Sequence, residues 1–421
     1  MIGDRLIRAG WIEDRGYTVA TYLQARNQKP KAKSQKSGIG ILPRGDYPLI
    51  AAVGGLAVLG LLMVYSGSYD LAYQNQGGDA AYYLTRQVLF MAGGTLVACL
   101  IARSDYAIWR RWSVLLMLGT LSLLVLVLVA GSERFGAQRT LFNGSIQPSE
   151  IAKLVMVLYI ADWLASKGDK LQLASYGLIP FGAIVGVVAG LIFRQPDYGT
   201  GVLIVLTAGV MFFLAGADLR QAFIGMVGAV ATILILMLAT GHTSERLGQF
   251  VDPARTSDQM QQVMKALQAG GLTGVGLGNG ILKIGYLPLA HTDSIFALVA
   301  VELGLVGVLG LLSLYAFIAY RGYHIAVKAP DTYGQLLAFG ATTAIISQAL
   351  INICVMTGIL PLTGITLPFM SYGGSSLISL MASIGVLISV SRGTRKGKAN
   401  DAFMDRVRRD RRSRLPGPGS H

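Results

Sequence analysis

A short polar cluster, His291, Thr292 and Asp293, opens a long apolar run in the segment LPLAHTDSIFALVAVELGL, residues 287–305. A carboxylate in the first turn of a membrane helix lies where the helix dipole favours negative charge and where water can reach it. Asp293 is therefore the first candidate for a general base, although a helix cap is the simpler interpretation of an isolated aspartate. Glu302 follows nine residues later, about 13 Å along a helix and inside the hydrocarbon, where an unpaired charge costs roughly 3 kcal/mol.

Polar groups also mark the starts of other apolar runs. Glu150 and Lys153, in QPSEIAKL, lie three residues apart and so share one helix face, and Asp197 opens the next such run in QPDYGT. Ser375 follows a segment rich in proline and glycine, LPLTGITLPFMSYGGSS, whose irregular backbone must line a cavity or be buried in protein. These observations predict a charged, hydrated pocket that contains Glu150, Lys153, Asp197, Asp293 and Glu302.

Each candidate also has a structural interpretation. Lys153 can neutralise Glu150, Asp197 or Glu302 instead of contacting a substrate, and Arg246 can be an ordinary solvated or headgroup residue. The chain has four histidines and no His/Cys cluster, which argues against zinc. A Mg²⁺ or Mn²⁺ ion bound by carboxylates stays open, so the identity of any metal is unknown at this point.

The composition indicates a polytopic membrane protein. Of the 421 residues, 53% are hydrophobic and only 14% are charged. The net charge of +14 comes from basic residues in the two tails and in short loops, which is typical of membrane topology and not of nucleic-acid binding. The two cysteines, Cys99 and Cys354, lie inside apolar runs and indicate no disulfide framework.

The predicted fold class is all-α, with about ten transmembrane helices and both termini in the cytoplasm. A basic cytoplasmic tail, residues 1–46, precedes a ten-helix domain at 47–391, and a second basic cytoplasmic tail follows at 392–421. The ten spans are 47–66, 84–103, 109–130, 150–166, 173–192, 197–216, 221–240, 293–320, 334–358 and 372–391. In this topology the second, fourth, sixth, eighth and tenth spans all begin on the outer face, where their polar starts meet.

One long outer loop, residues 241–292, separates the seventh and eighth spans. Its apolar residues Met260, Val263, Met264 and Leu267 have helical spacing, which predicts an amphipathic helix on the membrane face. The loop is therefore interpreted as an ordered lid over the pocket. Its end, GGLTGVGLGNG at 270–280, follows no strand, so we expect a flexible hinge there and not a nucleotide-binding loop.

Six motifs along the chain resemble, in order, the signature segments of the SEDS family (shape, elongation, division and sporulation). They are GAQR at 136–139, QPSEIAKL, QPDYGT, RLGQFVDP at 246–253, AHTDSIFALVAVELG and LPLTGITLPFMSYGGSS. The resemblance covers nearly all ten predicted helices. The chain departs from the family pattern at Thr140, Ser294 and Val301, which bears on fine substrate contacts. The long basic N-terminal tail and the ending GVLISVSRGTR are more similar to the division and sporulation branch than to the elongation branch.

The resemblance implies an inverting peptidoglycan glycosyltransferase of the bacterial inner membrane that polymerises lipid II, the undecaprenyl-diphosphate-linked disaccharide, with its active site outside. It also implies a class B penicillin-binding protein and other division proteins as partners, and it places Asp293 on the catalytic aspartate. A base near the acceptor 4-hydroxyl suits Asp293, and Lys153, Arg246 and Arg139 are candidates to hold the charge of the departing diphosphate.

Two other functions compete with this interpretation. A flippase for the lipid-linked precursor could also use buried groups such as Glu302 and Lys153. A translocation path should continue to the inner face, however, where the sequence offers only Asp162. A scaffold with a vestigial pocket is the second alternative, and it predicts that Asp293→Ala leaves function intact.

Overall fold

The computed structural model describes residues 46–134, 137–141, 146–239, 248–250, 257–280 and 290–413. Arg246, most of the N-terminal tail and the last eight residues lie outside these ranges, so the predictions made for them are not compared with the structure.

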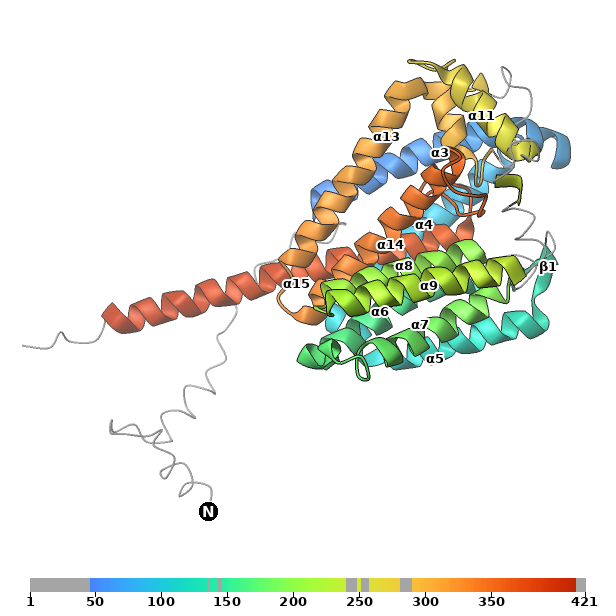
Figure 1. The fold of residues 1–421 in the computed structure, drawn as a ribbon. Helices are drawn as coiled ribbons and strands as arrows, with labels where there is room; N and C mark the ends of the chain where they lie inside the picture. Colours follow the sequence, from blue (N-terminus) through green and yellow to red (C-terminus); the bar gives the residue numbers. More distant parts are fainter. Residues whose placement is uncertain are drawn as a thin grey trace, which may run out of the picture. The chain divides into compact units, whose positions relative to one another are not determined.

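Helices in the described residues lie at all ten positions that the sequence predicts (Figure 1). They are α3 (Tyr47–Asn75), α4 (Tyr82–Arg103), α5 (Tyr106–Ala130), α6 (Pro148–Lys167), α7 (Leu178–Phe193), α8 (Tyr198–Leu214), α9 (Leu219–Ala239), α13 (Ile295–Val327), α14 (Thr332–Met356) and α15 (Gly374–Ser413). A 3-10 helix, η1 (Gly168–Gln172), follows α6, and the amphipathic helix α11 (Asp258–Gly270) lies between α9 and α13.

Six helices in the described part of the chain are long and apolar enough to cross a membrane, namely α3, α4, α5, α13, α14 and the Gly374–Gly393 part of α15. Shorter apolar helices are Leu178–Phe193, Tyr198–Leu214 and Leu219–Ile233, while α6 carries several charges within its 20 residues. The protein is thus a helical, multi-pass membrane protein. The number of ten crossings, their sidedness and the outer position of the long loop stay predictions.

Aspartates begin four of these helices. The carboxylates of Asp46, Asp105, Asp197 and Asp331 each accept a hydrogen bond from a backbone N–H in the first turn of α3, α5, α8 and α14. These first-turn N–H groups have no partner within the helix, so a capping carboxylate stabilises each start by about 1 kcal/mol.

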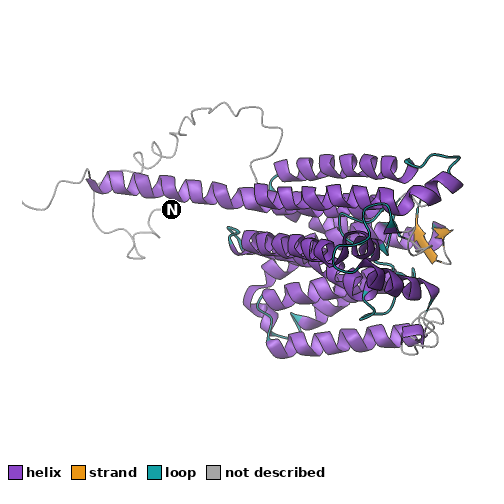
Figure 2. Ribbon diagram, turned by 90° about the horizontal axis from the view of Figure 1, so that it is seen from above, coloured by secondary structure: helices purple, strands orange, loops and turns teal. Residues whose placement is uncertain are grey.

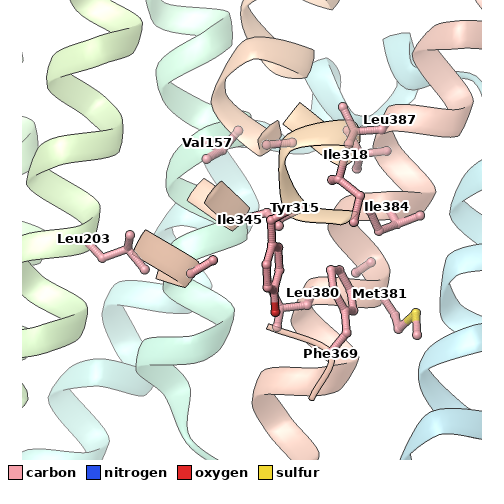
Figure 3. Packing of buried hydrophobic residues seen from close by; sticks show 14 of the residues in the cluster. Val157, Leu203, Tyr315, Ile318, Ile345, Phe369, Leu380, Met381, Ile384 and Leu387 are labelled. Carbon is pink, nitrogen blue, oxygen red and sulfur yellow. The ribbon is translucent and has the colours of Figure 1, made fainter. Parts of the chain in front are cut away.

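The chain contains 53 glycines, and the helices pack closely where such small residues face a neighbour. Gly385 of α15 lies against α4 so tightly that a Cβ there would come within 2.7 Å of the Ala98 carbonyl oxygen. Around the middle of the bundle, apolar side chains fill the space between the helices (Figure 3). This core includes Val157 of α6, Leu203 of α8, Ile345 of α14, Tyr315 and Ile318 of α13, and Leu380, Ile384 and Leu387 of α15.

The structure departs from the predicted fold at the glycine-rich segment 270–280. α13 breaks at Gly304, whose φ of 65° is in the left-handed region, and Figure 1 shows it bent beside α11. The N–H groups of Val275 and Gly276 donate to the carbonyls of Val301 and Glu302, at 3.0 Å each. The segment predicted as a flexible hinge therefore supplies hydrogen bonds that the broken helix lacks, and its flexibility stays a prediction.

Three further features refine the sequence prediction. Two short antiparallel strands, β1 (Ser132–Arg134) and β2 (Ala137–Thr140), add a small sheet to the otherwise helical fold (Figure 2). The amphipathic helix predicted around Met260–Leu267 is confirmed as α11, which buries Val263 and Ala266. α15 continues to Ser413, so no helix end marks the boundary that the sequence places at 391.

Candidate functional site

The N-terminal ends of α4, α6, α8, α13 and α15 meet, as the alternating topology predicts. Gln87 near the start of α4 donates to the Ser371 carbonyl at 3.1 Å, just before α15, and the Tyr372 N–H donates to the His291 carbonyl at 2.8 Å, just before α13. The start of α6 joins both α15 and α8 through the contacts described below. We take this end of the helical bundle as the candidate site.

Asp293 lies in the turn 290–294 that leads into α13. The sequence predicts it in the first turn of the helix, but the helix begins at Ile295 with Ser294 as its N-cap, so Asp293 precedes the cap. Its backbone carbonyl accepts a hydrogen bond from Asn352 Nδ2 at 3.0 Å. Its half-buried side chain lies next to Gly364, where a Cβ would be 3.5 Å from Asp293 Oδ2.

Lys153 is part of a buried ion pair. Its Nζ lies 2.7 Å from Glu150 Oε2, and the two side chains are only 8% and 9% exposed. Nζ also donates to Gln348 Oε1 of α14 at 2.7 Å. Of the three carboxylates that the sequence offers as partners, the structure selects Glu150, because the i,i+3 spacing on α6 places both groups on the same face.

Asp197 and Ser375 lie beside this pair. Asp197 Oδ2 accepts from Ser149 Oγ at 2.8 Å and from Gln147 Nε2 at 3.1 Å, while its other oxygen caps α8. The Gln147 N–H donates to Ser375 Oγ at 3.2 Å. Asp197 therefore fixes α8 to the start of α6, and Ser375 fixes α15 to the same point.

Arg139 projects from β2 toward the turn before α8. Its guanidinium donates to the Gln195 carbonyl at 3.3 Å and also to the Pro196 carbonyl. A guanidinium has five N–H donors, so these two contacts orient Arg139 and leave it able to bind a further anion.

Glu302 differs from the other predicted residues. Its side chain accepts hydrogen bonds from Ser66 of α3 and from the backbone N–H groups of Gly278 and Gly280. The residue is 1% exposed. The structure thus assigns Glu302 to the junction between α3, α13 and the glycine-rich segment, and not to the Glu150–Lys153 pair with which the sequence grouped it.

Two amide side chains that the sequence analysis did not single out complete the site. Gln348 and Asn352 lie inside α14 with exposures of 1% and 0%. They contact Lys153 and Asp293 as described above, and both also bind the segment 357–373. A signal existed in the sequence, because buried polar residues within an apolar span are uncommon and usually have a partner.

An aromatic cluster adjoins Asp293. The ring of His291 lies 4.8 Å from that of Tyr83 and 5.8 Å from that of Tyr372, measured between centroids. Burial lowers the pKa of His291 to about 4, so its imidazole is neutral at pH 7. Burial also raises the pKa of Tyr372, against the effect of the nearby Arg86 guanidinium. Arg86 is exposed and lies over the Tyr82 ring, 4.9 Å from its centroid.

A large apolar cavity lies between α7, α8 and α9 and has a volume of about 1060 Å³. Its lining is almost entirely hydrophobic and includes Phe181, Phe193, Phe212 and Ile224. Such a cavity in a membrane protein suits a hydrocarbon chain. Among the residues that the structure describes, no three His, Cys, Asp or Glu side chains are grouped so that they could hold a metal ion.

The chain is similar to the members of one protein family. A family model described as "Cell cycle protein", which covers FtsW, RodA and SpoVE, matches residues 47–396. The chain is 37% identical over 361 residues to the probable peptidoglycan glycosyltransferase FtsW of Trichlorobacter lovleyi, which covers 83% of this chain and 93% of that relative. It is 40% identical over 349 residues to stage V sporulation protein E of Bacillus subtilis, which covers 81% and 95% respectively.

Solved structures are also similar to this chain. The rod shape determining protein RodA of Thermus thermophilus is 28% identical, with a TM-score of 0.63 over 84% of this chain and 98% of that one. A chain in a structure described as "Structural coordination of polymerization and crosslinking by a peptidoglycan synthase complex" is 29% identical, with a TM-score of 0.70 over 83% and 98%. Since the family model spans residues 47–396 and relatives above 30% identity cover four-fifths of the sequence, the chain belongs to the FtsW, RodA and SpoVE family of membrane glycosyltransferases.

Proposed function

We propose that this protein polymerises lipid II into glycan strands at the outer face of the bacterial inner membrane, with Asp293 as the general base. The observation that carries the proposal is the position of Asp293. Its half-buried carboxylate lies in a turn where the N-terminal ends of several helices meet, and its backbone is held by Asn352. A base at the boundary between water and protein can take a proton without the cost of burial deep in the bilayer.

The reaction needs one proton transfer and one displacement. Asp293 accepts the proton of the acceptor sugar 4-hydroxyl while that oxygen forms a bond to the anomeric carbon of the lipid-linked chain. The bond between this carbon and the diphosphate oxygen breaks, and the undecaprenyl diphosphate leaves with the electron pair. A single displacement inverts the anomeric configuration and needs no covalent intermediate. No acid has to protonate the diphosphate, because it is already a good leaving group.

Cationic side chains near the site stabilise the charge that develops on the diphosphate. Arg139, Lys153 and Arg246 are the candidates from the sequence, and the exposed Arg86 joins them in the structure. Lys153 is held by Glu150 and Gln348. Its charge therefore acts on the diphosphate from a fixed, buried position. A requirement for Mg²⁺ or Mn²⁺ is measured by repeating the assay with EDTA.

The proposal also implies a binding place for the lipid part of the substrate and a set of protein partners. The apolar cavity between α7, α8 and α9 supports binding of a long hydrocarbon chain beside the helices. A class B penicillin-binding protein is the expected partner, in line with the description of a related chain within a peptidoglycan synthase complex. The similarity to proteins named FtsW and stage V sporulation protein E supports a role in division, with other division proteins as further partners.

A flippase for the same precursor is the alternative from the sequence. It would need polar groups along a path to the opposite end of the bundle, where Asp162 is held by Arg110 at 2.8 Å and by Ser113 at 2.9 Å. These contacts favour a structural role for Asp162. The other alternative is a RodA-like polymerase that serves cell elongation. It would catalyse the same reaction within a different protein complex.

The test is polymerisation of labelled lipid II by the purified protein, alone and with a class B penicillin-binding protein. Asp293→Asn keeps the shape of the side chain and removes the base, so we expect a loss of about 100- to 10,000-fold in kcat with unchanged thermal stability. Failure of the wild-type protein to polymerise under both conditions, together with transfer of lipid II across liposome bilayers, would establish the flippase instead.

A further inference from the structure

Two amide side chains on one face of α14, Gln348 and Asn352, form what we call the amide pair. They are one helical turn apart, so they lie one above the other. With exposures of 1% and 0%, neither amide can hydrogen-bond to bulk water. Burying an amide without partners costs roughly 1 to 3 kcal/mol, so these two side chains need hydrogen-bond partners within the protein.

Asn352 joins two segments of non-helical backbone. Its Nδ2 donates one hydrogen bond to the Asp293 carbonyl at 3.0 Å and another to the Ile365 carbonyl at 2.6 Å. Both N–H groups of the amide are therefore used on backbone oxygens that belong to no helix. Through this one side chain, α14 sets the distance between the turn 290–294 and the segment 357–373.

Gln348 joins the same segment to the ion pair. Its Nε2 donates to the Thr366 carbonyl at 3.0 Å and to Thr366 Oγ1 at 3.2 Å. Its Oε1 accepts from Lys153 Nζ at 2.7 Å. The amide pair thus holds the adjacent residues Ile365 and Thr366 from one helix, and it connects them to Asp293 on one side and to Lys153 on the other.

Gly364, the residue before the stretch that the amide pair holds, lies beside the Asp293 carboxylate. A Cβ on Gly364 would lie 3.5 Å from Asp293 Oδ2, and its φ of 70° is one that favours glycine. The segment that the amide pair fixes therefore lies beside the Asp293 side chain. Asn352 holds Asp293 at its backbone, and the carboxylate lies beside Gly364 of the same fixed segment.

We infer that Gln348 and Asn352 are positioning residues that set the location of the Asp293 carboxylate relative to the Glu150–Lys153 pair. The inference rests on the proposed glycosyltransfer for its kinetic consequences, but the geometric statement stands without it. In the contacts above, both amides use their N–H groups, and Gln348 Oε1 accepts from Lys153. Asn352 Oδ1 is buried and has no hydrogen-bond partner among the described residues. The contacts that the two amides make therefore act through Asp293, Lys153 and the segment 357–373.

Three variants distinguish a positioning role of the amide pair from the general effect of changing a buried polar side chain in α14. Asn352→Leu keeps the branching and the number of side-chain heavy atoms and supplies no donor, so both carbonyls lose their partner. Gln348→Glu keeps an acceptor for Lys153 but loses the donors to Thr366. The matched control is Thr342→Val on the same helix, because Thr342 is 0% exposed and its hydroxyl donates only within its own helix, to the Ala338 carbonyl at 2.8 Å.

The kinetic experiment compares lipid II polymerisation by the full chain with its class B partner in lipid nanodiscs. A misplacement of about 1 Å can cost up to roughly 100-fold in rate. We expect Asn352→Leu and Gln348→Glu to lower kcat by about 10- to 100-fold while KM changes by less than about 3-fold. The acidic limb of the pH–rate profile should also shift, because it reports the environment of Asp293. Thr342→Val should match the wild type in all three measurements.

A second readout does not depend on activity. The rate at which a carbodiimide modifies the Asp293 carboxyl, followed by peptide mass spectrometry, should change at least several-fold in Asn352→Leu and Gln348→Glu and stay unchanged in Thr342→Val. If the wild type does not polymerise lipid II, the proposed function fails and this labelling still decides the positioning. Equal labelling and equal kcat in the wild type and both amide variants would overturn the inference.

Discussion

The two ends of the helical bundle use their polar side chains differently. At the end opposite Asp293, charged groups join helices directly to one another. Arg321 of α13 binds Asp46 at the start of α3, with its Nε 3.1 Å from the carboxylate, and Arg110 of α5 binds Asp162 of α6 at 2.8 Å. Tyr106 donates to Asp331 at 2.7 Å, which links α5 to the start of α14.

At the candidate site, polar side chains also join helices, as Asp197 and Lys153 do, but several others bind the backbone of irregular segments. Besides the amide pair, Arg139 binds the carbonyls of the turn before α8, and Gln87 binds the carbonyl of Ser371. Tyr315 reaches from α13 to the Pro368 carbonyl at 2.6 Å. Backbone groups outside a helix have no internal partner and cannot be left unpaired at membrane depth. The comparison shows that charged side chains join helices to one another at the opposite end, while the candidate site adds side chains that hold loop backbone in place.

The buried pair at the site should have the largest effect on stability. Lys153→Met leaves Glu150 buried without its cation, and breaking such a pair typically costs about 3 to 5 kcal/mol. We expect a marked fall in the thermal unfolding midpoint in detergent. The double variant Glu150→Gln/Lys153→Met removes both charges and should recover most of the loss. An unchanged midpoint for Lys153→Met would mean that the pair does not hold α6 in place.

His291 should make the stability of the site depend on pH. Its pKa of about 4 in the folded protein lies below the 6.5 of an unfolded chain, so below pH 6.5 the unfolded chain binds more protons than the folded protein. The stabilisation is complete above pH 6.5 and falls by at most roughly 3 kcal/mol as the pH approaches 4.

Thermal unfolding of the purified protein between pH 4 and 7 measures this effect. His291→Gln cannot take up a proton and should flatten the dependence in this range. Tyr83→Phe keeps a ring against the imidazole, so it should retain the wild-type slope. A slope that persists in His291→Gln would assign the pH dependence to other groups.

Much of the architecture could be predicted because apolar runs of about 20 residues have one stable form in a bilayer. The positions of the ten helices, the meeting of the polar starts of α4, α6, α8, α13 and α15, and the amphipathic helix α11 all followed from periodicity and charge. The choice of Glu150 as the partner of Lys153 was left open, because it depends on how each helix is rotated about its axis.

Other features depend on contacts that leave no local pattern. The break at Gly304 needs the backbone of residues 271–276, about 30 residues away in the sequence, to replace the lost helical hydrogen bonds. For the same reason a polar residue in α14 could be noticed, but its partners could not be named. The carbonyls of Asp293 and Ile365 that Asn352 binds belong to turns whose course only the folded protein defines.

The smallest effect on stability is expected for the Arg110–Asp162 pair, at the end of the bundle opposite Asp293. This pair tests whether that end contributes to the candidate site. The Arg110 side chain is 46% exposed and that of Asp162 is 24% exposed, so water and salt screen their attraction. An exposed pair of this kind contributes about 0 to 1 kcal/mol. Arg110→Gln should therefore shift the unfolding midpoint slightly and leave lipid II polymerisation at the wild-type rate. A large loss of activity in this variant would show that the opposite end also positions the site, because α6 would then transmit the change from Asp162 to Lys153.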